Sequence, residues 1–453
     1  MFVSLLRHCR TAMLASMLLL HGNNTAALGL MEAYDAALQN DPTYRAAIYE
    51  QQAGREFEEI GKSYLRPNLS ANYSINRNRA DIETETRLGE TTDHRNYQSR
   101  NGGINLRQPL FNLESMARYR QGVAQTRASD AQFSADSQDM MVRLVSLYVG
   151  AIYAEDQLAL ATAQRDAFAE QRKVNDRLFN KGEGTVTDMI ETQAKFDLAE
   201  AQVQESLDAL VNARAALAAL VGRDISHLAP LKDGFSVAPM LPATLEEWKT
   251  VALERNPEII AQRHAVEAAN QEIKKSEAGH APRLDAVLGI NQTSSDTIAT
   301  YKQDATVKSI GLQLTIPIYS GGSVSAVTRQ TASNYGKAQA HLDSKTNDVL
   351  LELRKQFNAT LNAISRIDAL VKSVSSARLL IEATKKSIKG GLRTNVDILN
   401  AQRQMFEVKL ELAQARYNYL VNYLRLRKAA GTLAVTDLQA ISGYFESGAG
   451  NFR

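Results

Sequence analysis

The stretch LQLTIPIYSGGS, residues 312–323, has the pattern of a strand that meets a proline and then turns. Before Pro317, apolar residues alternate with polar or small ones, and this period of two predicts a strand with one apolar face. The apolar members are Ile310, Leu312, Leu314 and Ile316. The segment INLRQPLFNLES, residues 104–115, repeats the arrangement around Pro109. The rest of the chain is rich in alanine, glutamine and leucine, which favours long helices, so isolated strands within it need an explanation.

Charge and composition argue against several classes of function. The chain has 453 residues, with 52 Lys plus Arg against 50 Asp plus Glu, so its net charge of +2 gives no field suited to nucleic acid. Its seven histidines are scattered without HExxH spacing, and the chain contains neither a G-x-S-x-G elbow nor a Walker loop. We therefore expect no enzyme activity, no cofactor and no metal site.

The first 27 residues have the pattern of a secretory signal peptide. Arg7 and Arg10 precede an apolar run at residues 11–20, and small residues follow at the expected cleavage position. A run of about 10 apolar residues is too short to span a bilayer. A buried N-terminal helix is the alternative. The single cysteine, Cys9, lies in this segment, so the exported chain would form no disulfide and carry no N-terminal lipid anchor.

The chain repeats itself after about 210 residues. NDPTYRAA at residue 40 corresponds to RNPEIIAQ at residue 255, and KGEGTVTDMIETQ at residue 181 corresponds to GGLRTNVDILNAQ at residue 390. This duplication defines the predicted domains. They are a first structural repeat at 28–222, a proline-containing linker at 223–250, a second repeat at 251–431 and a tail at 432–453.

Each repeat is predicted to hold one pair of strands, at 68–109 and 283–317, with a polar loop between the strands of a pair. Alternation over about 10 residues is typical of membrane-barrel strands, although an ordinary half-buried strand gives the same pattern. Four strands cannot close a membrane barrel, which needs about eight. Either the strands form a soluble sheet, or several chains combine theirs. Four prolines stand in matched pairs beside these strands, a placement that ordinary strand punctuation explains only in part: Pro67, Pro109, Pro282 and Pro317.

Two proline-free stretches, 115–180 and 324–389, predict very long helices. About 66 residues at 1.5 Å per residue give a length of roughly 100 Å. Apolar residues in the second stretch keep the three- and four-residue spacings of coiled-coil contact: Phe357, Leu361, Ile364, Ile367 and Val371. A rod of this length has no core of its own, so its apolar stripe must meet neighbouring helices. A plain fibrous coiled coil satisfies the same pattern.

In combination, these features resemble the TolC-like family of outer-membrane efflux and secretion channels. The resemblance covers nearly all of the chain after residue 27 and rests on the duplicated halves with LRQPLF, IPIYSGG, ARYNYLVN and AAGTL. LRQPLFN, GEGTVTD and AGHAPRLD are most similar to the branch that serves type I secretion of extracellular proteases.

The family implies a mainly α-helical homotrimer in the Gram-negative outer membrane. Three chains would contribute four strands each to one twelve-stranded barrel. A long α-helical coiled-coil barrel would continue it across the periplasm, and the four prolines would mark the junctions between barrel and helix. The implied partners are a periplasmic adaptor protein, an inner-membrane ABC transporter and outer-membrane lipid.

The same resemblance implies a periplasmic gate at the helix turns. Its hinges would be Gly182, Gly184, Gly390 and Gly391. Asp397 and Asn400 are three residues apart on one helical face, which in the family lines the closed mouth. Three copies of Asp397 would form an acidic ring that favours cations. Many relatives carry a second acid where this chain has Asn400, so the ring is expected to be less charged.

A latch is implied beside this ring. Arg393 matches the family's gate-latching arginine, and Thr187 and Asp188 match its partners on the neighbouring coil. A tyrosine that joins the latch in some relatives is Ile388 here, which predicts a smaller network. Capping of helix N-termini is the alternative role for Asp188 and Asp397.

Two other functions stay open beside the secretion duct. A structural periplasmic coiled coil would be an elongated soluble protein, whereas a duct would be extracted only with detergent. A duct could instead serve a multidrug efflux pump, because a wide water-filled tunnel has little side-chain selectivity. An enzyme is the weakest alternative.

Overall fold

The computed structural model describes residues 27–87, 89–232, 235–237, 239–295, 303–390, 392–393 and 395–446. The predicted signal peptide, residues 1–27, lies outside them except for its last residue, and stays a prediction. The chain divides into two compact units. We call them the helical unit, formed by Met1–Ala47, Ala135–Asn256 and Asp348–Arg453, and the strand unit, formed by Ile48–Ser134 and Pro257–Asn347.

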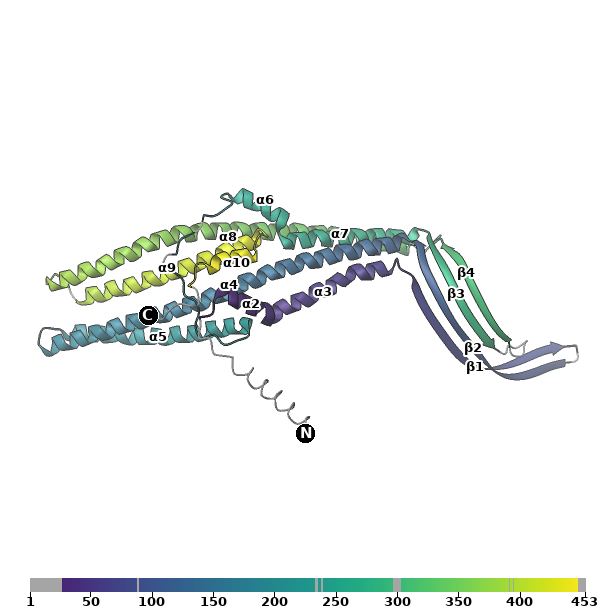
Figure 1. Cartoon of the computed structure of the whole chain (residues 1–453), viewed down its shortest axis with the longest axis horizontal. Coiled ribbons are helices and arrows are strands. Elements are labelled where there is room, and N and C mark those ends of the chain that lie inside the picture. Colours follow the sequence, from purple (N-terminus) through teal and green to yellow (C-terminus); the bar gives the residue numbers. More distant parts are fainter. Residues whose placement is uncertain are drawn as a thin grey trace, which may run out of the picture. The chain divides into compact units, whose positions relative to one another are not determined.

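The described residues form helices and one four-stranded sheet (Figure 1). The helices are α2 (Leu30–Asn40), α3 (Pro42–Ser63), α4 (Leu113–Asn180), α5 (Val186–Val221), α6 (Leu245–Arg255), α7 (Pro257–Glu277), the 3-10 helix η1 (Ala278–His280), α8 (Ser323–Lys389), α9 (Asn395–Ala429) and α10 (Val435–Ser442). The strands are β1 (Asn68–Thr86), β2 (Gly89–Phe111), β3 (Arg283–Ser295) and β4 (Gln303–Thr315). The predicted combination of very long helices with four strands is confirmed.

The sheet is antiparallel with strand order β1-β2-β3-β4, so β1 and β4 form its edges. β1 pairs with β2 from Asn68↔Arg107 to Thr86↔Gly89, whereas β3 pairs with β2 only from Ser99 to Phe111. The outer part of the β1–β2 hairpin therefore extends past β3. The prediction of a polar loop between β1 and β2 was wrong, because most of that segment continues both strands in register.

The two faces of the sheet have opposite character. The register places Leu69 opposite Leu106, and Leu106 opposite Leu288, so one face carries a continuous apolar surface. On β4 the side chains of Ile310 and Leu312 are 84% and 69% exposed in the single chain. The other face is lined by amides and hydroxyls: Asn68, Ser70, Asn72, Asn105, Asn291 and Ser309.

The four prolines lie at or near strand ends. Pro67 and Pro282 directly precede β1 and β3, and Pro317 follows the end of β4. Pro109 lies inside β2, which ends two residues later at Phe111. The pairing of β2 with β3 is irregular between Pro109 and Phe111, because proline has no N–H to give to the ladder.

The core lies in the helical unit. Tyr148 on α4 is fully buried among leucines of α5 and α9, and its hydroxyl donates to the carbonyl oxygen of Leu28 at 2.8 Å. Trp248 on α6 is the centre of a second cluster with Leu353 and Phe357 of α8. Thr244 caps α6, since its hydroxyl accepts from the backbone N–H of Glu247 at 3.4 Å.

The internal duplication is visible where each repeat closes. Gly222 after α5 has φ 78°, and an added Cβ would lie 2.6 Å from Asn40. Gly431 after α9 has φ 70°, and an added Cβ would lie 2.3 Å from the carbonyl oxygen of Arg255. Both sites require glycine, because the left-handed backbone disfavours other residues and no space is left for a side chain. Asn40 of the NDP segment thus contacts the end of α5, and Arg255 of the RNP segment contacts the end of α9 in the matching position.

The apolar stripe of α8 is only partly covered within one chain. Phe357 and Ile367 are buried, whereas Leu361 and Val371 are 42% and 46% exposed. None of the helices in the described residues combines the length and the apolarity needed to cross a membrane.

Candidate functional site

The first helix turn joins α4 to α5 through residues 181–185. Gly182 adopts φ 76°, and a Cβ on Gly184 would lie 2.8 Å from the backbone nitrogen of Phe179. Thr185 is the N-cap of α5, and its hydroxyl accepts from the backbone N–H of Asp188 at 3.1 Å. The turn is therefore tight and glycine-dependent. Thr185, not Asp188, supplies the cap that closes the N-terminus of α5.

A buried polar cluster fixes this turn. The side-chain amide of Asn175 on α4 donates to the Thr192 hydroxyl at 2.7 Å, and that hydroxyl donates to the carbonyl oxygen of Asp188 at 2.7 Å. Asn175 and Thr192 are 3% and 1% exposed. Since buried polar groups are costly unless they are paired, the cluster holds α4 against the first turns of α5. It thereby positions Thr187 and Asp188.

The second helix turn joins α8 to α9. The Gly390 N–H donates to the carbonyl oxygen of Lys386 at 3.2 Å, and Gly391 lies outside the described residues. Arg393 is exposed, Asp397 lies half-buried in the first turn of α9, and Asn400 is exposed one turn later. The candidate gate residues on this side therefore occupy the turn and the start of α9.

A contact between hairpins reaches Asn400. The Lys195 ammonium on α5 donates to the Asn400 side-chain oxygen at 3.3 Å and forms an ion pair with Glu191 at 2.8 Å. The contact joins the α4–α5 hairpin to α9 within one chain. Sequence reasoning missed Lys195, because its partner is 205 residues away and no local pattern relates them.

A second contact joins α4 to α9. The Tyr417 hydroxyl donates to the Asp156 carboxylate at 2.7 Å, and the rings of Tyr153 and Tyr417 pack edge to face. Burial raises the pKa of Asp156, while the hydrogen bond from Tyr417 and the nearby charge of Arg416 act against the rise. Burial also raises the pKa of Tyr417. Both groups lie among the helices, where charge is poorly solvated.

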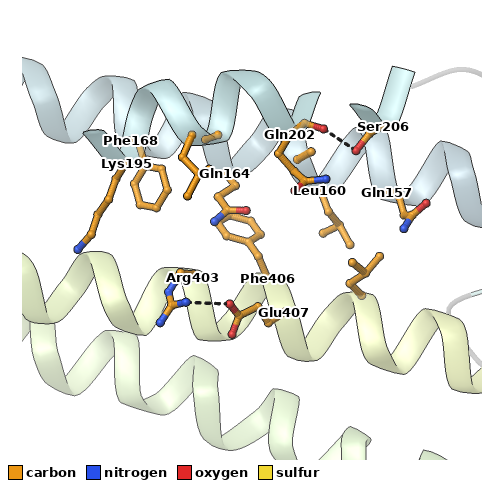
Figure 2. Close-up of a pocket in the computed structure, with 14 residues that line it drawn as sticks. Gln157, Leu160, Gln164, Phe168, Lys195, Gln202, Ser206, Arg403, Phe406 and Glu407 are labelled. Carbon is orange, nitrogen blue, oxygen red and sulfur yellow. Dashed lines mark hydrogen bonds and ion pairs between the residues drawn. The ribbon is translucent and has the colours of Figure 1, made fainter. Parts of the chain in front are cut away.

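A cavity of about 320 Å³ lies between the α4–α5 hairpin and α9 (Figure 2). Lys195 extends from α5 towards α9, and on α9 Arg403 and Glu407 form an ion pair at 3.2 Å. Phe168 and Phe406 contribute apolar surface. The α4–α5 hairpin and α9 are thus incompletely packed against each other at this cavity. The contact of Lys195 with Asn400 bridges this region.

The predicted site residues gather on two turns, although not all of them contact one another. Thr187 and Asp188 share the first turn of α5, and Asp397 and Asn400 share α9. Within the described part of one chain, Arg393 forms no hydrogen bond or ion pair with Thr187 or Asp188. Among all the residues that the structure describes, no group of His, Cys, Asp or Glu side chains is arranged to hold a metal ion.

Comparison with known proteins gives closely related curated sequences. The chain is 40% identical over 445 residues to the alkaline protease secretion protein AprF of Pseudomonas aeruginosa, covering 98% of this chain and 92% of the relative. It is 36% identical over 441 residues to the proteases secretion protein PrtF of Dickeya chrysanthemi, covering 97% and 96%.

The fold has counterparts among solved structures. CusC, described as forming a transmembrane channel, superimposes with a TM-score of 0.77 at 18% identity, covering 91% of this chain and 95% of that chain. The family model for outer membrane efflux proteins matches residues 33–223 and 248–432, one segment in each half of the chain. With both halves matched and the helices and strands arranged as in CusC, the chain belongs to the outer membrane efflux protein family.

Proposed function

We propose that this protein is the outer-membrane channel-tunnel of a type I secretion system, a passive duct that exports proteins from the cell. The observation that carries the proposal is the 40% identity, over nearly the whole chain, to a protein named for alkaline protease secretion. A protease-like protein is accordingly the proposed cargo.

The duct is a homotrimer. One chain supplies a four-stranded sheet with free edges at β1 and β4 and a continuous apolar face. An open edge in lipid leaves backbone groups unpaired, so β4 of one chain pairs with β1 of the next until the sheet closes. Three chains give twelve strands, enough for a closed barrel. The apolar face then contacts outer-membrane lipid, and the face with Asn72, Asn105 and Asn291 lines water.

The helices continue the duct through the periplasm. Exposed members of the α8 stripe, such as Leu361 and Val371, gain a partner when neighbouring chains pack beside them. A periplasmic adaptor protein and an inner-membrane ABC transporter deliver the cargo to the helix turns. In this role the chain is a passive conduit for transport and needs no catalytic centre.

The helix turns form the gate. Three copies of Asp397 narrow the mouth and favour cations, with Asn400 beside them. Arg393 latches the closed mouth against Thr187 and Asp188 of the neighbouring coil. Gly182, Gly184, Gly390 and Gly391 let the turns change shape, and the four prolines mark the passage from barrel to helix.

Efflux of small toxic molecules is the second candidate. The description of the matching family, outer membrane efflux protein, favours it. The relatives with 36–40% identity favour protein secretion more specifically.

Two measurements test the proposal. Detergent-purified protein in a planar bilayer should give small cation-selective conductance steps, and Arg393→Ser should enlarge them. Absence of conductance from folded protein would leave only a structural coiled coil.

The cargo is tested in a bacterium that carries the ABC transporter, the adaptor and a protease but lacks the outer-membrane component. Restored extracellular protease with unchanged drug resistance supports secretion. The reverse result supports efflux.

A further inference from the structure

A cavity of about 570 Å³ lies in the strand unit where the strands meet the helices. Its wall is formed by the end of α3, the first residues of β1 and β3, the end of β2 and the first turns of α4. Four guanidinium groups and two carboxylates line it: Arg66, Arg107, Arg118, Arg283, Glu114 and Asp285. The lining therefore has an excess of positive charge.

Three of these arginines have an acidic partner. Arg66 pairs with Glu59 at 3.1 Å, Arg118 pairs with Glu114 at 2.7 Å, and Arg107 pairs with Asp285. The side chain of Arg283 is half-buried and forms no hydrogen bond or ion pair with any residue that the structure describes. Arg283 thus provides an uncompensated guanidinium group in the cavity wall.

Asp285 provides an unused acceptor beside it. This residue is 1% exposed, and its Oδ2 atom accepts from Arg107. Its Oδ1 atom is buried and has no hydrogen-bond partner in the described residues. A buried oxygen of this kind in a cavity wall indicates that something with a donor belongs there. A matching ligand carries an anionic group for Arg283 and an N–H or O–H donor for Asp285.

The position of the cavity relative to the sheet decides which ligands reach it. Arg107 is paired with Asn68, whereas Leu106 is paired with Leu69, so Arg107 lies on the polar face. Asp285 lies on the same face, since its neighbours Leu284 and Ala286 belong to the apolar one. In the closed barrel this face lines water and not lipid. The cavity is therefore reached from the path of the cargo.

We propose that this cavity, here named the junction site, is a contact site for acidic stretches of the polypeptide that passes through the duct. The inference rests on the proposed function. A polypeptide supplies both required groups: a side-chain carboxylate that the Arg283 fork binds in bidentate fashion, and a backbone N–H that donates to Asp285. Hydrogen phosphate also carries an anionic group and an O–H donor, so competition between the peptide and phosphate is the measurement that separates these two ligands.

The binding at each junction site is weak and repeated. A duct conducts only if its sites hold the cargo briefly and release it. Three copies around one path raise the effective concentration of acidic segments at the passage from helix to barrel. The junction site thereby favours entry of acidic polypeptide into the barrel without a tight complex.

The test uses the purified full-length protein and a fluorescent unfolded peptide rich in glutamate, with a peptide of the same length carrying glutamine as its control. We expect the acidic peptide to block single-channel conductance and to bind in fluorescence anisotropy. Arg283→Gln should weaken both about tenfold, a loss typical of one desolvated charged contact. Arg329→Gln is the matched control, because it removes the same charge from an exposed position on α8 in the same unit, away from the cavity.

The outcomes separate the two proposals. Conductance without preferential block by the acidic peptide would overturn the junction site and leave the duct standing, whereas a folded protein without conductance would overturn the duct. Equal weakening by Arg283→Gln and Arg329→Gln would assign the effect to general charge and overturn the site. Displacement of the peptide by inorganic phosphate at equal concentration would identify a plain anion site and overturn the polypeptide assignment. Arg283→Lys keeps the positive charge but loses the planar guanidinium fork, so it should bind the acidic peptide with intermediate affinity. This variant provides a second test at the same position in case Arg283→Gln does not fold.

Discussion

The contact between Lys195 and Asn400 allows a quantitative test of how the gate is held. Lys195 is the residue of the α4–α5 hairpin that reaches across the cavity of Figure 2 towards the start of α9. If the mouth opens by moving α9 away from α5, this hydrogen bond breaks. Lys195→Ala removes it in advance and should raise the open fraction of the duct.

The magnitude follows from the exposure and length of the contact. The Lys195 side chain is 22% exposed, and its 3.3 Å bond to a neutral amide is long, so each copy stabilises the closed state by about 0.5 kcal/mol. Three copies that open together lose about 1.5 kcal/mol, and 1.4 kcal/mol corresponds to about a tenfold change in population. The open probability should therefore rise by roughly one order of magnitude.

Single-channel recording measures this change directly. The matched control is Lys173→Ala, because among the described residues the Lys173 ammonium pairs only with Glu170 on its own helix, at 2.7 Å and with both side chains exposed. It removes the same charge from the same hairpin without touching α9. We expect the Lys173→Ala channel to open as rarely as the wild type. The increase in open probability caused by Lys195→Ala should persist in part at high salt, since the hydrogen bond from Lys195 to the Asn400 amide is not an ion pair.

An open probability of Lys195→Ala equal to that of the wild type would refute the reasoning. It would mean that the bond survives opening, and hence that α5 and α9 move together. A rise of the same size in Lys173→Ala would assign the effect to the overall charge of the hairpin.

Further predictions concern the packing of the helical unit. Gly431→Ala should destabilise the folded protein by several kcal/mol more than Gly182→Ala. Both residues have positive φ, which costs a non-glycine residue about 1–2 kcal/mol, but only the added Cβ at residue 431 collides with backbone, 2.3 Å from the carbonyl oxygen of Arg255. Equal losses of thermal stability in the two variants would contradict this prediction. Because burial raises the pKa of Asp156 above its ordinary value of 3.8, the folded chain holds that proton more tightly than the unfolded chain. This contribution to stability is therefore greatest below pH 3.8 and falls as pH rises through the window up to the raised pKa, and Asp156→Asn should flatten that decline in melting temperatures measured against pH. Tyr417→Phe, which removes the donor to the carboxylate, should cost about 1.5–3 kcal/mol at neutral pH, and an unchanged melting temperature there would show that the hydrogen bond contributes nothing.

Local patterns in the sequence predicted the long helices and the inner halves of the strands, but not the outer part of the β1–β2 hairpin. Alternation of apolar residues predicted the inner halves of the strands, because one face of each is apolar, and the absence of proline predicted the long helices. The outer part of the β1–β2 hairpin carries charges on both faces and shows no such alternation. It is held by cross-strand pairs such as Asp81 and His94, which lie directly opposite each other, and a pairing of this kind is not visible before the register is known.

The contacts of the candidate site were harder to predict from the sequence, for a different reason. Its most informative contacts join the two repeats: Lys195 with Asn400, Tyr417 with Asp156, and Arg107 with Asp285. Members of each pair are far apart in the chain, and each looks like an ordinary surface polar residue when considered alone. The resemblance to a family supplied positions for the gate, but partners specific to this chain required the fold.

The two helix turns differ in a way that bears on which of them can move. The duplication aligns Asn175 with Thr384 and Thr192 with Ala401. In the first repeat these positions form the buried cluster that ties α4 to the start of α5. In the second repeat Ala401 has no hydroxyl, and the hydroxyl of Thr384 is buried without a hydrogen-bond partner among the described residues. Among the described residues, the α8–α9 turn thus lacks the counterpart of the Asn175–Thr192 hydrogen bond, although both turns descend from the same repeated segment. A buried unpaired hydroxyl favours any rearrangement that lets it bond. In the proposed gate, the asymmetry therefore favours the α8–α9 turn, which carries Arg393 and Asp397, as the moving part and the α4–α5 turn as the fixed part.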